Sequence, residues 1–141
     1  MAGYGLIGER LGHSFSPQVH RFFADYDYRL IELAPEALAP FLRERAFSGV
    51  NVTIPYKRAV MPLCDALSDE AARIGSVNTI VNDGGRLTGY NTDYYGLRRM
   101  AEAAGIPFSG RKALILGSGG AARTALAAAR DLGASPARAF F

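Results

Sequence analysis

The segment Lys112-Ala-Leu-Ile-Leu-Gly-Ser-Gly-Gly-Ala-Ala-Arg-Thr124 decides the fold class of this chain. An apolar run ends at Leu116, and a glycine-rich stretch then opens a helix-like segment that continues to about Leu132. A strand, a glycine-rich turn and a helix in this order form the phosphate-binding unit of dinucleotide-binding folds. Gly117 permits the tight turn, and Gly119 permits a close approach of backbone to a diphosphate. We therefore predict a nucleotide-binding turn, with an ordinary strand–turn–helix unit as the alternative.

The rest of the sequence alternates between strand-like and helix-like stretches. Runs of β-branched and aromatic residues predict strands, and capped or proline-started stretches predict helices. The predicted strands span residues 4–7, 28–33, 49–54, 77–81, 86–90 and 112–116, with a last apolar piece at 137–141. The predicted helices span residues 16–25, 35–45, 68–75 and 92–104, with a helical stretch interrupted at Pro62 and a helix ending near residue 132.

Local signals indicate how several of these elements begin and end. Ser16 is expected to cap a helix whose first residue is Pro17, and Thr92 or Asp93 is expected to cap a later one. The stretch Asn82-Asp-Gly-Gly85 predicts a β-hairpin, because Asp-Gly supplies the positive φ angles that tight hairpins need. The strand at 112–116 is expected to be buried.

This alternation predicts an α/β fold with mostly parallel strands and one antiparallel hairpin. We expect an amino-terminal three-layer α/β substrate domain over residues 1–104. The linker-like stretch at 105–110 would then lead into the start of a Rossmann-type nucleotide-binding domain over residues 105–141.

The composition excludes several classes of function. The net charge of +3 comes from scattered arginines, whereas nucleic-acid-binding proteins gather basic residues on one face. No run of apolar residues is long enough to span a membrane, and we do not expect the short amino-terminal stretch to be a signal peptide. The single cysteine, Cys64, suits the reducing cytoplasm and is expected to be a small buried hydrophobic residue. No cluster of histidines and cysteines predicts a metal site.

Four polar clusters fall at the ends of predicted strands or the beginnings of predicted helices, where α/β sheets bind ligands. They span residues 13–17, 51–57, 77–79 and 91–93. Their hydroxyls, amides, single ammonium and single carboxylate suit a small polyhydroxylated acid better than a protein partner. Asn51 and Thr53 share one face of their strand, which is unusual unless that face meets a ligand. Lys57 stands out because this arginine-rich chain has only two lysines, and arginine cannot give up its proton at ordinary pH.

Each cluster also has a structural interpretation. Ser14 and Ser16 are equally consistent with helix caps, and Asn78 is consistent with a turn residue. His13 is expected to stabilise its loop rather than to act as a general base. Outside the four clusters, Asp69 is consistent with an acid at a helix start.

Five motifs occur in order at a spacing that resembles the shikimate dehydrogenase family from end to end. They are Gly5-Leu-Ile-Gly8 with His13-Ser-Phe-Ser-Pro17, Asn51-Val-Thr-Ile-Pro-Tyr-Lys57, Gly75-Ser-Val-Asn-Thr79, Gly89-Tyr-Asn-Thr-Asp93 and Gly117-Ser-Gly-Gly-Ala121. The resemblance implies the reversible NADPH-dependent reduction of 3-dehydroshikimate to shikimate, a step of aromatic amino acid (chorismate) biosynthesis.

The resemblance also implies roles for individual residues. Lys57 and Asp93 would be the catalytic pair. The residues implied to bind shikimate are Ser14, Ser16, Asn51, Thr53, Lys57, Asn78 and Asp93. Those implied to lie at the NADP site are Asp69, Gly117, Ser118, Gly119, Gly120 and Ala121. No metal is implied.

The chain departs from the family in two respects. Glu9-Arg10 stands where many members carry Asn-Pro, although neither position is a ligand position. Family sequences are also considerably longer, and their later segments hold the 2′-phosphate of NADP and cover the first domain. We therefore expect these 141 residues alone to be a poor enzyme or none, as a monomer or homodimer. A dehydrogenase acting on both quinate and shikimate, and a non-catalytic shikimate-binding remnant, are the alternatives.

Overall fold

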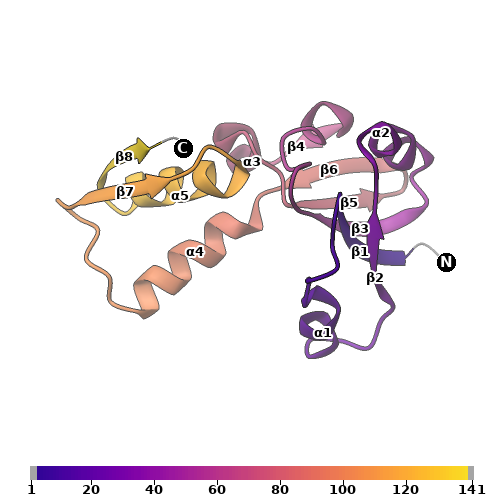
Figure 1. Ribbon diagram of the computed structural model, residues 1–141, viewed down its shortest axis with the longest axis horizontal. Coiled ribbons are helices and arrows are strands. Elements are labelled where there is room, and N and C mark those ends of the chain that lie inside the picture. Colours follow the sequence, from indigo (N-terminus) through magenta and orange to yellow (C-terminus); the bar gives the residue numbers. More distant parts are fainter. Residues whose placement is uncertain (1–2, 140–141) are drawn as a thin grey trace.

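The computed structural model describes residues 3–139 and contains two sheets joined by a long helix (Figure 1). The strands of the larger sheet are β1 (Gly3–Gly8), β2 (Tyr28–Glu32), β3 (Phe47–Val52), β4 (Ala66–Leu67), β5 (Thr79–Asp83) and β6 (Arg86–Tyr90). Its helices are α1 (Ser16–Arg21), α2 (Pro35–Glu44), the 3₁₀ helix η1 (Met61–Leu63) and α3 (Asp69–Ile74). The remaining elements are α4 (Thr92–Ala103), β7 (Lys112–Leu116), α5 (Gly120–Asp131) and β8 (Ser135–Ala139).

The larger sheet has the strand order β2-β1-β3-β5-β6-β4. β1 pairs in parallel with both β2 and β3, and β4 pairs in parallel with β6. Only β5 runs against its neighbours, with Asn51 opposite Thr79 across the β3–β5 pair. The prediction of an α/β fold with a mostly parallel sheet is therefore confirmed.

The main hydrophobic core lies between one face of this sheet and two segments that cover it, α2 and η1. Ile7 and Val52 are neighbours in the β1–β3 register and are almost fully buried. They pack in one cluster with Leu42 of α2 and with Val60, which precedes η1. Cys64 is packed against the same cluster, and burial raises the pKa of its thiol to about 11, as suits an unreactive thiol.

Helix α1 lies away from this core, at the lower end of the view in Figure 1, and approaches β2. The ring of His20 stacks on the ring of Tyr28 with centroids 3.8 Å apart, and its Nδ1 is hydrogen-bonded to the Tyr26 hydroxyl. These aromatic contacts fix α1 to the sheet, and with it the serine-containing loop that precedes the helix.

Helix α4 leads from the six-stranded sheet to the parallel pair β7–β8, against which α5 packs (Figure 1). Three side chains join α3, α4 and α5. The carboxylate of Asp131, at the end of α5, accepts hydrogen bonds from Arg73 of α3 and from the Tyr94 hydroxyl of α4. The arginine holds the pKa of Asp131 below its usual value, so the carboxylate is ionised at neutral pH. Helix α5 is thus bonded directly to α3 and α4.

Several boundaries differ from those predicted. Helix α1 ends at Arg21 rather than near Asp25. The Ser16 side chain does not cap it, because Ser16 is itself the first helical residue and Phe15 occupies the cap position. The stretch after Pro55 consists of turns and η1 rather than an α-helix, because prolines at 55 and 62 lack a backbone donor and restrict the residues before them.

One helix cap and one strand boundary also differ. Asn91, not Thr92 or Asp93, caps α4 through its side chain. The hairpin turn uses the positive φ angles of Gly84 and Gly85, so Asp83 remains in β5.

The prediction of a buried strand at 112–116 is wrong. Leu114 and Leu116 are exposed, because α5 covers only one face of the pair β7–β8 in the described structure. Of the apolar piece at 137–141, residues 137–139 belong to β8 and residues 140 and 141 lie outside the described residues. Within residues 3–139, no helix combines the length and the apolarity needed to cross a membrane.

Candidate active site

A cleft of about 1020 Å³ opens at the edge of the large sheet where β1, β3 and β6 end and β5 begins. The chain turns at this edge four times, and each turn carries one of the polar clusters identified in the sequence. All seven residues predicted to bind substrate line the cleft: Ser14, Ser16, Asn51, Thr53, Lys57, Asn78 and Asp93. The topology therefore brings together side chains that are separated by up to 79 positions in the sequence, from Ser14 to Asp93.

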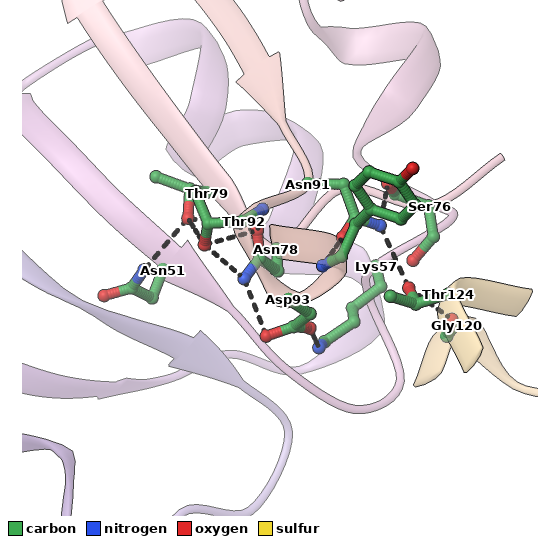
Figure 2. Close-up of polar contacts among 11 residues, drawn as sticks. Asn51, Lys57, Ser76, Asn78, Thr79, Asn91, Thr92, Asp93, Gly120 and Thr124 are labelled. Atoms are coloured by element: carbon green, nitrogen blue, oxygen red, sulfur yellow. Dashed lines mark hydrogen bonds and ion pairs between the residues drawn. The ribbon is translucent and has the colours of Figure 1, made fainter. Parts of the chain in front are cut away.

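Lys57 and Asp93 form an ion pair within this cleft, with 2.5 Å between Nζ and Oδ2 (Figure 2). Lys57 follows β3, and its carbonyl accepts a hydrogen bond from the Val77 amide at 2.8 Å. Asp93 lies in the first turn of α4, where the positive end of the helix dipole favours a carboxylate. The lysine side chain is 17% exposed and the aspartate side chain 42%, so the ammonium is sheltered while the carboxylate remains accessible.

Asn78 holds the other oxygen of Asp93. Its Nδ2 donates to Asp93 Oδ1 at 2.9 Å and to the Thr92 hydroxyl at 2.8 Å (Figure 2). Its Oδ1 accepts from the Thr92 amide at 2.8 Å. Asn78 is 7% exposed, so these bonds fix both the amide and the carboxylate in the wall of the cleft.

Asn51 of β3 lies on the sheet floor of the cleft and is held by side chains from β2 and β5. Tyr28 donates its hydroxyl hydrogen to Asn51 Oδ1 at 2.7 Å, and Asn51 Nδ2 donates to the Thr79 hydroxyl at 3.1 Å. Burial raises the pKa of Tyr28 to about 12, so its hydroxyl remains a proton donor at neutral pH. The bonds fix which end of the Asn51 amide faces each neighbour.

The loop between β1 and α1 contributes the two serines. Its backbone is held by Glu32 at the end of β2, whose Oε1 accepts from the Leu11 amide at 2.7 Å. The Ser14 hydroxyl donates to the Ser16 hydroxyl at 3.1 Å, so both hydroxyls face the same part of the cleft. His13 also lines the cleft from this loop.

A second cavity, of about 650 Å³, lies between the loop that follows β3 and the glycine-rich turn before α5. It is lined by Gly117, Ser118, Gly119, Gly120 and Ala121, together with Thr53 and Lys57. Gly117 has a φ of 121°, which only glycine adopts readily. No side chain caps α5 in the described structure, so the first backbone N–H groups of this helix, beside the cavity, have no side-chain acceptor.

Thr53 and Lys57 line both cavities, so the two spaces share a wall that contains the lysine. Gly120 packs on the other side of that wall. A Cβ on Gly120 would lie 2.6 Å from Ser76 Oγ and 3.0 Å from Lys57 Cβ, so this position has room only for glycine. The glycine-rich turn can pack closely against Lys57 because Gly120 has no side chain.

The structure leaves one predicted site residue apart from the others. Asp69 is the first residue of α3, is exposed, and lines neither cavity. Conversely, Tyr28 and Thr79 were missed as site residues, although both hold Asn51. Thr79 lay within a polar cluster of the sequence, but Tyr28 could be found only from the strand register. Among the described residues, no group of three or more histidine, cysteine or acidic side chains is placed to hold a metal ion.

A polar cleft beside a glycine-rich turn that opens a helix is typical of dinucleotide-binding α/β proteins. The family model described as the shikimate dehydrogenase substrate binding domain matches residues 6–80. The chain belongs to the shikimate dehydrogenase family.

Curated relatives and solved structures agree with this assignment. The NADP(+) shikimate dehydrogenase of Clostridium beijerinckii is 43% identical, with 94% of this chain and 52% of the relative covered. That of Halothermothrix orenii is 46% identical, with 93% and 48% covered. Shikimate dehydrogenase 1 of Peptoclostridium difficile superposes with a TM-score of 0.90 at 41% identity, covering 98% of this chain and 54% of that one. The Thermus thermophilus shikimate 5-dehydrogenase in complex with NADP(H) and shikimate superposes with a TM-score of 0.89 at 38% identity. The match covers 99% of this chain and 56% of that one. The chain thus spans about half the length of the curated relatives it matches.

Proposed function

We propose that this chain carries the shikimate site and the first part of the cofactor site of an NADP-dependent shikimate dehydrogenase. The observation that supports this most strongly is the position of Lys57, which is paired with Asp93 and lies on the wall shared by the two cavities. A group that exchanges a proton with substrate while hydride passes to or from a dinucleotide must lie at such a boundary.

The proposed reaction adds a hydride to the carbonyl carbon of 3-dehydroshikimate and a proton to its oxygen. NADPH, when bound, supplies the hydride. The Lys57 ammonium donates the proton to the developing alkoxide, and the neutral amine takes it back in the reverse direction. Asp93 orients the ammonium, and Asn78 in turn fixes Asp93 through Oδ1. The hydroxyls and amides of Ser14, Ser16, Asn51 and Thr53 are proposed to bind the polar groups of shikimate.

The glycine-rich turn fits the diphosphate of the cofactor. The backbone at Gly119 is open, because a Cβ placed there would meet nothing within 4 Å, and the amino end of α5 is uncapped in the described structure. Free N–H groups at a helix amino terminus bind phosphate readily. We therefore propose residues 1–104 as the substrate domain and residues 105–141 as the beginning of the NADP domain, with Asp69 near the cofactor. A reducing cytoplasm, and a monomer or homodimer, are part of the same proposal.

Two neighbouring glycines provide a matched test of the turn. Gly120→Ala is expected to lower the free energy of unfolding by about 1 to 3 kcal/mol, because the new methyl group overlaps Ser76 and Lys57. Gly119→Ala is expected to cost less than about 1 kcal/mol, since the space beside it is open. It should nevertheless weaken NADP binding, because the methyl group stands where the diphosphate would approach. Denaturant unfolding and NADP titration measure the two effects, and equal losses of stability would contradict this assignment of the turn.

The proposed function is tested by assaying NADP reduction by the full-length protein with shikimate and, separately, with quinate. We expect turnover with shikimate that requires NADP. Comparable turnover with quinate would indicate a dual-specificity enzyme. Absence of turnover together with measurable shikimate binding would indicate a non-catalytic shikimate-binding protein.

A further inference from the structure

A buried asparagine connects the substrate cleft to the glycine-rich turn. Asn91 precedes Asp93 in the sequence cluster at 91–93, yet it is 1% exposed and does not line the cleft. Its side chain points away from the substrate groups, toward α5 (Figure 2). Its position therefore suits a structural connection rather than contact with a ligand.

The amide of Asn91 joins three segments of the chain. Its Oδ1 accepts from the Tyr94 amide at 3.1 Å and so fixes the start of α4, which carries Asp93. Its Nδ2 donates to the Ser76 carbonyl at 2.9 Å, two residues before Asn78. The second Nδ2 hydrogen goes to the Thr124 hydroxyl at 3.1 Å. Both amide hydrogens and the amide oxygen are thus engaged.

Thr124 completes the connection to the turn. It is 2% exposed, and its hydroxyl donates to the Gly120 carbonyl at 3.1 Å while accepting from Asn91. Gly120 is the first residue of α5 and packs against Ser76 and Lys57. Ser76 Oγ has no hydrogen-bond partner within the described part of the chain, so that contact is packing alone. At the start of α5 the directional bonds run through Asn91 and Thr124, whereas Asp131 makes those at the end of this helix.

We propose that Asn91 and Thr124 are positioning residues that set the glycine-rich turn, and hence the cofactor, at a fixed distance and angle from Lys57 and Asp93. The inference rests on the proposed function. Hydride transfer requires the two reactants to be held within narrow limits, and small displacements lower the rate steeply. A buried pair bonded at once to the start of α4 and the start of α5 provides such a constraint.

Thr124 offers a matched pair of variants. Thr124→Val keeps the shape of the side chain and removes the hydroxyl, leaving one buried Asn91 hydrogen without its acceptor. Thr124→Ser keeps the hydroxyl and removes the methyl group. In the full-length protein, Thr124→Val is expected to lower kcat by about 10-fold and to raise KM for NADP, with KM for shikimate little changed. Thr124→Ser is expected to keep a kcat close to that of the unsubstituted protein.

Two outcomes would overturn the proposal. One is equal loss of kcat in both variants, which would assign the effect to packing of the methyl group. The other is a Thr124→Val protein that melts at a lower temperature but keeps its kcat and KM for NADP, which would assign Thr124 to stability alone.

A failure of the proposed function can be distinguished from these outcomes. An unsubstituted protein that does not oxidise shikimate would refute the function. The connection would then be decided by NMR amide shifts, which need no ligand. Thr124→Val should move the signals of Thr92 and Asp93, and Thr124→Ser should leave them nearly unchanged. No movement in either variant would overturn the proposal.

Discussion

Replacement of Lys57 by alanine in the full-length protein is expected to lower kcat by at least about 100-fold, with a much smaller change in KM for shikimate. In the proposed reaction, the ammonium supplies the proton that the alkoxide needs as hydride arrives. The other polar groups of the cleft remain to bind the ground state, since Asn51, Asn78 and the serines are held by their own hydrogen bonds. Steady-state kinetics in both directions measure the effect. An unchanged kcat would refute the assignment of the proton donor.

Two control variants separate proton transfer from charge and from general effects of losing a lysine. Lys57→Arg keeps the positive charge beside Asp93, but arginine does not give up a proton at ordinary pH, so kcat should stay low. Lys112→Ala removes the only other lysine, which is exposed at the start of β7, and should leave kcat close to that of the unsubstituted protein. Recovery of activity in Lys57→Arg would show that charge alone is required.

Replacement of Asp93 by asparagine is expected to be the second most damaging change. The change removes the negative charge that pairs with the Lys57 ammonium. It also puts an amide, which has one acceptor oxygen in place of two, beside the Asn78 Nδ2 group that donates to Asp93. We expect kcat to fall substantially, and we expect the Lys57→Ala, Asp93→Asn double variant to be little worse than either single variant, because paired catalytic groups act as a unit. Asp83→Asn, at an exposed position of the hairpin, serves as the control. Fully multiplicative losses in the double variant would show that the two groups act separately.

Much of the fold could be predicted because local signals agreed with the final structure. The apolar run before Gly117 became β7 with the predicted bounds, and Ser68 caps α3 through a bond from the Ala71 amide. The hairpin around Gly84 and Gly85 follows from the need for positive φ angles. In each case the residues that carry the signal lie within one turn of the feature that they specify.

Features that depend on packing between distant segments were not predictable in this way. Leu114 and Leu116 look like core residues in sequence, but exposure depends on which elements cover a strand. The sequence at 54–60 resembles a helix, but Pro55 and Pro62 together leave only turns there. Asn91 resembles its polar neighbours, and only the folded chain shows that it turns inward to Thr124.

In the candidate site, too, some residues could be predicted from the sequence and others could not. The residues of the cleft were found because polar side chains at strand ends are unusual, and the family motifs agreed with them. Tyr28 was missed because its contact with Asn51 crosses 23 positions of sequence and depends on the register of β2, β1 and β3. Sequence patterns therefore identified the groups that line the cleft better than the groups that hold them in place.

The central claim, that the cleft at the edge of the large sheet binds shikimate, is tested most directly by titrating the isotopically labelled chain with shikimate and following its amide NMR signals. The account predicts that the largest shifts fall on Ser14, Asn78 and Asp93, at the turns that surround the cleft. The groove lined by Tyr26 and Phe41, at the opposite end of the sheet where β1 and β2 begin, should be unaffected. Shifts concentrated at that groove, or no shifts at millimolar shikimate, would contradict the account.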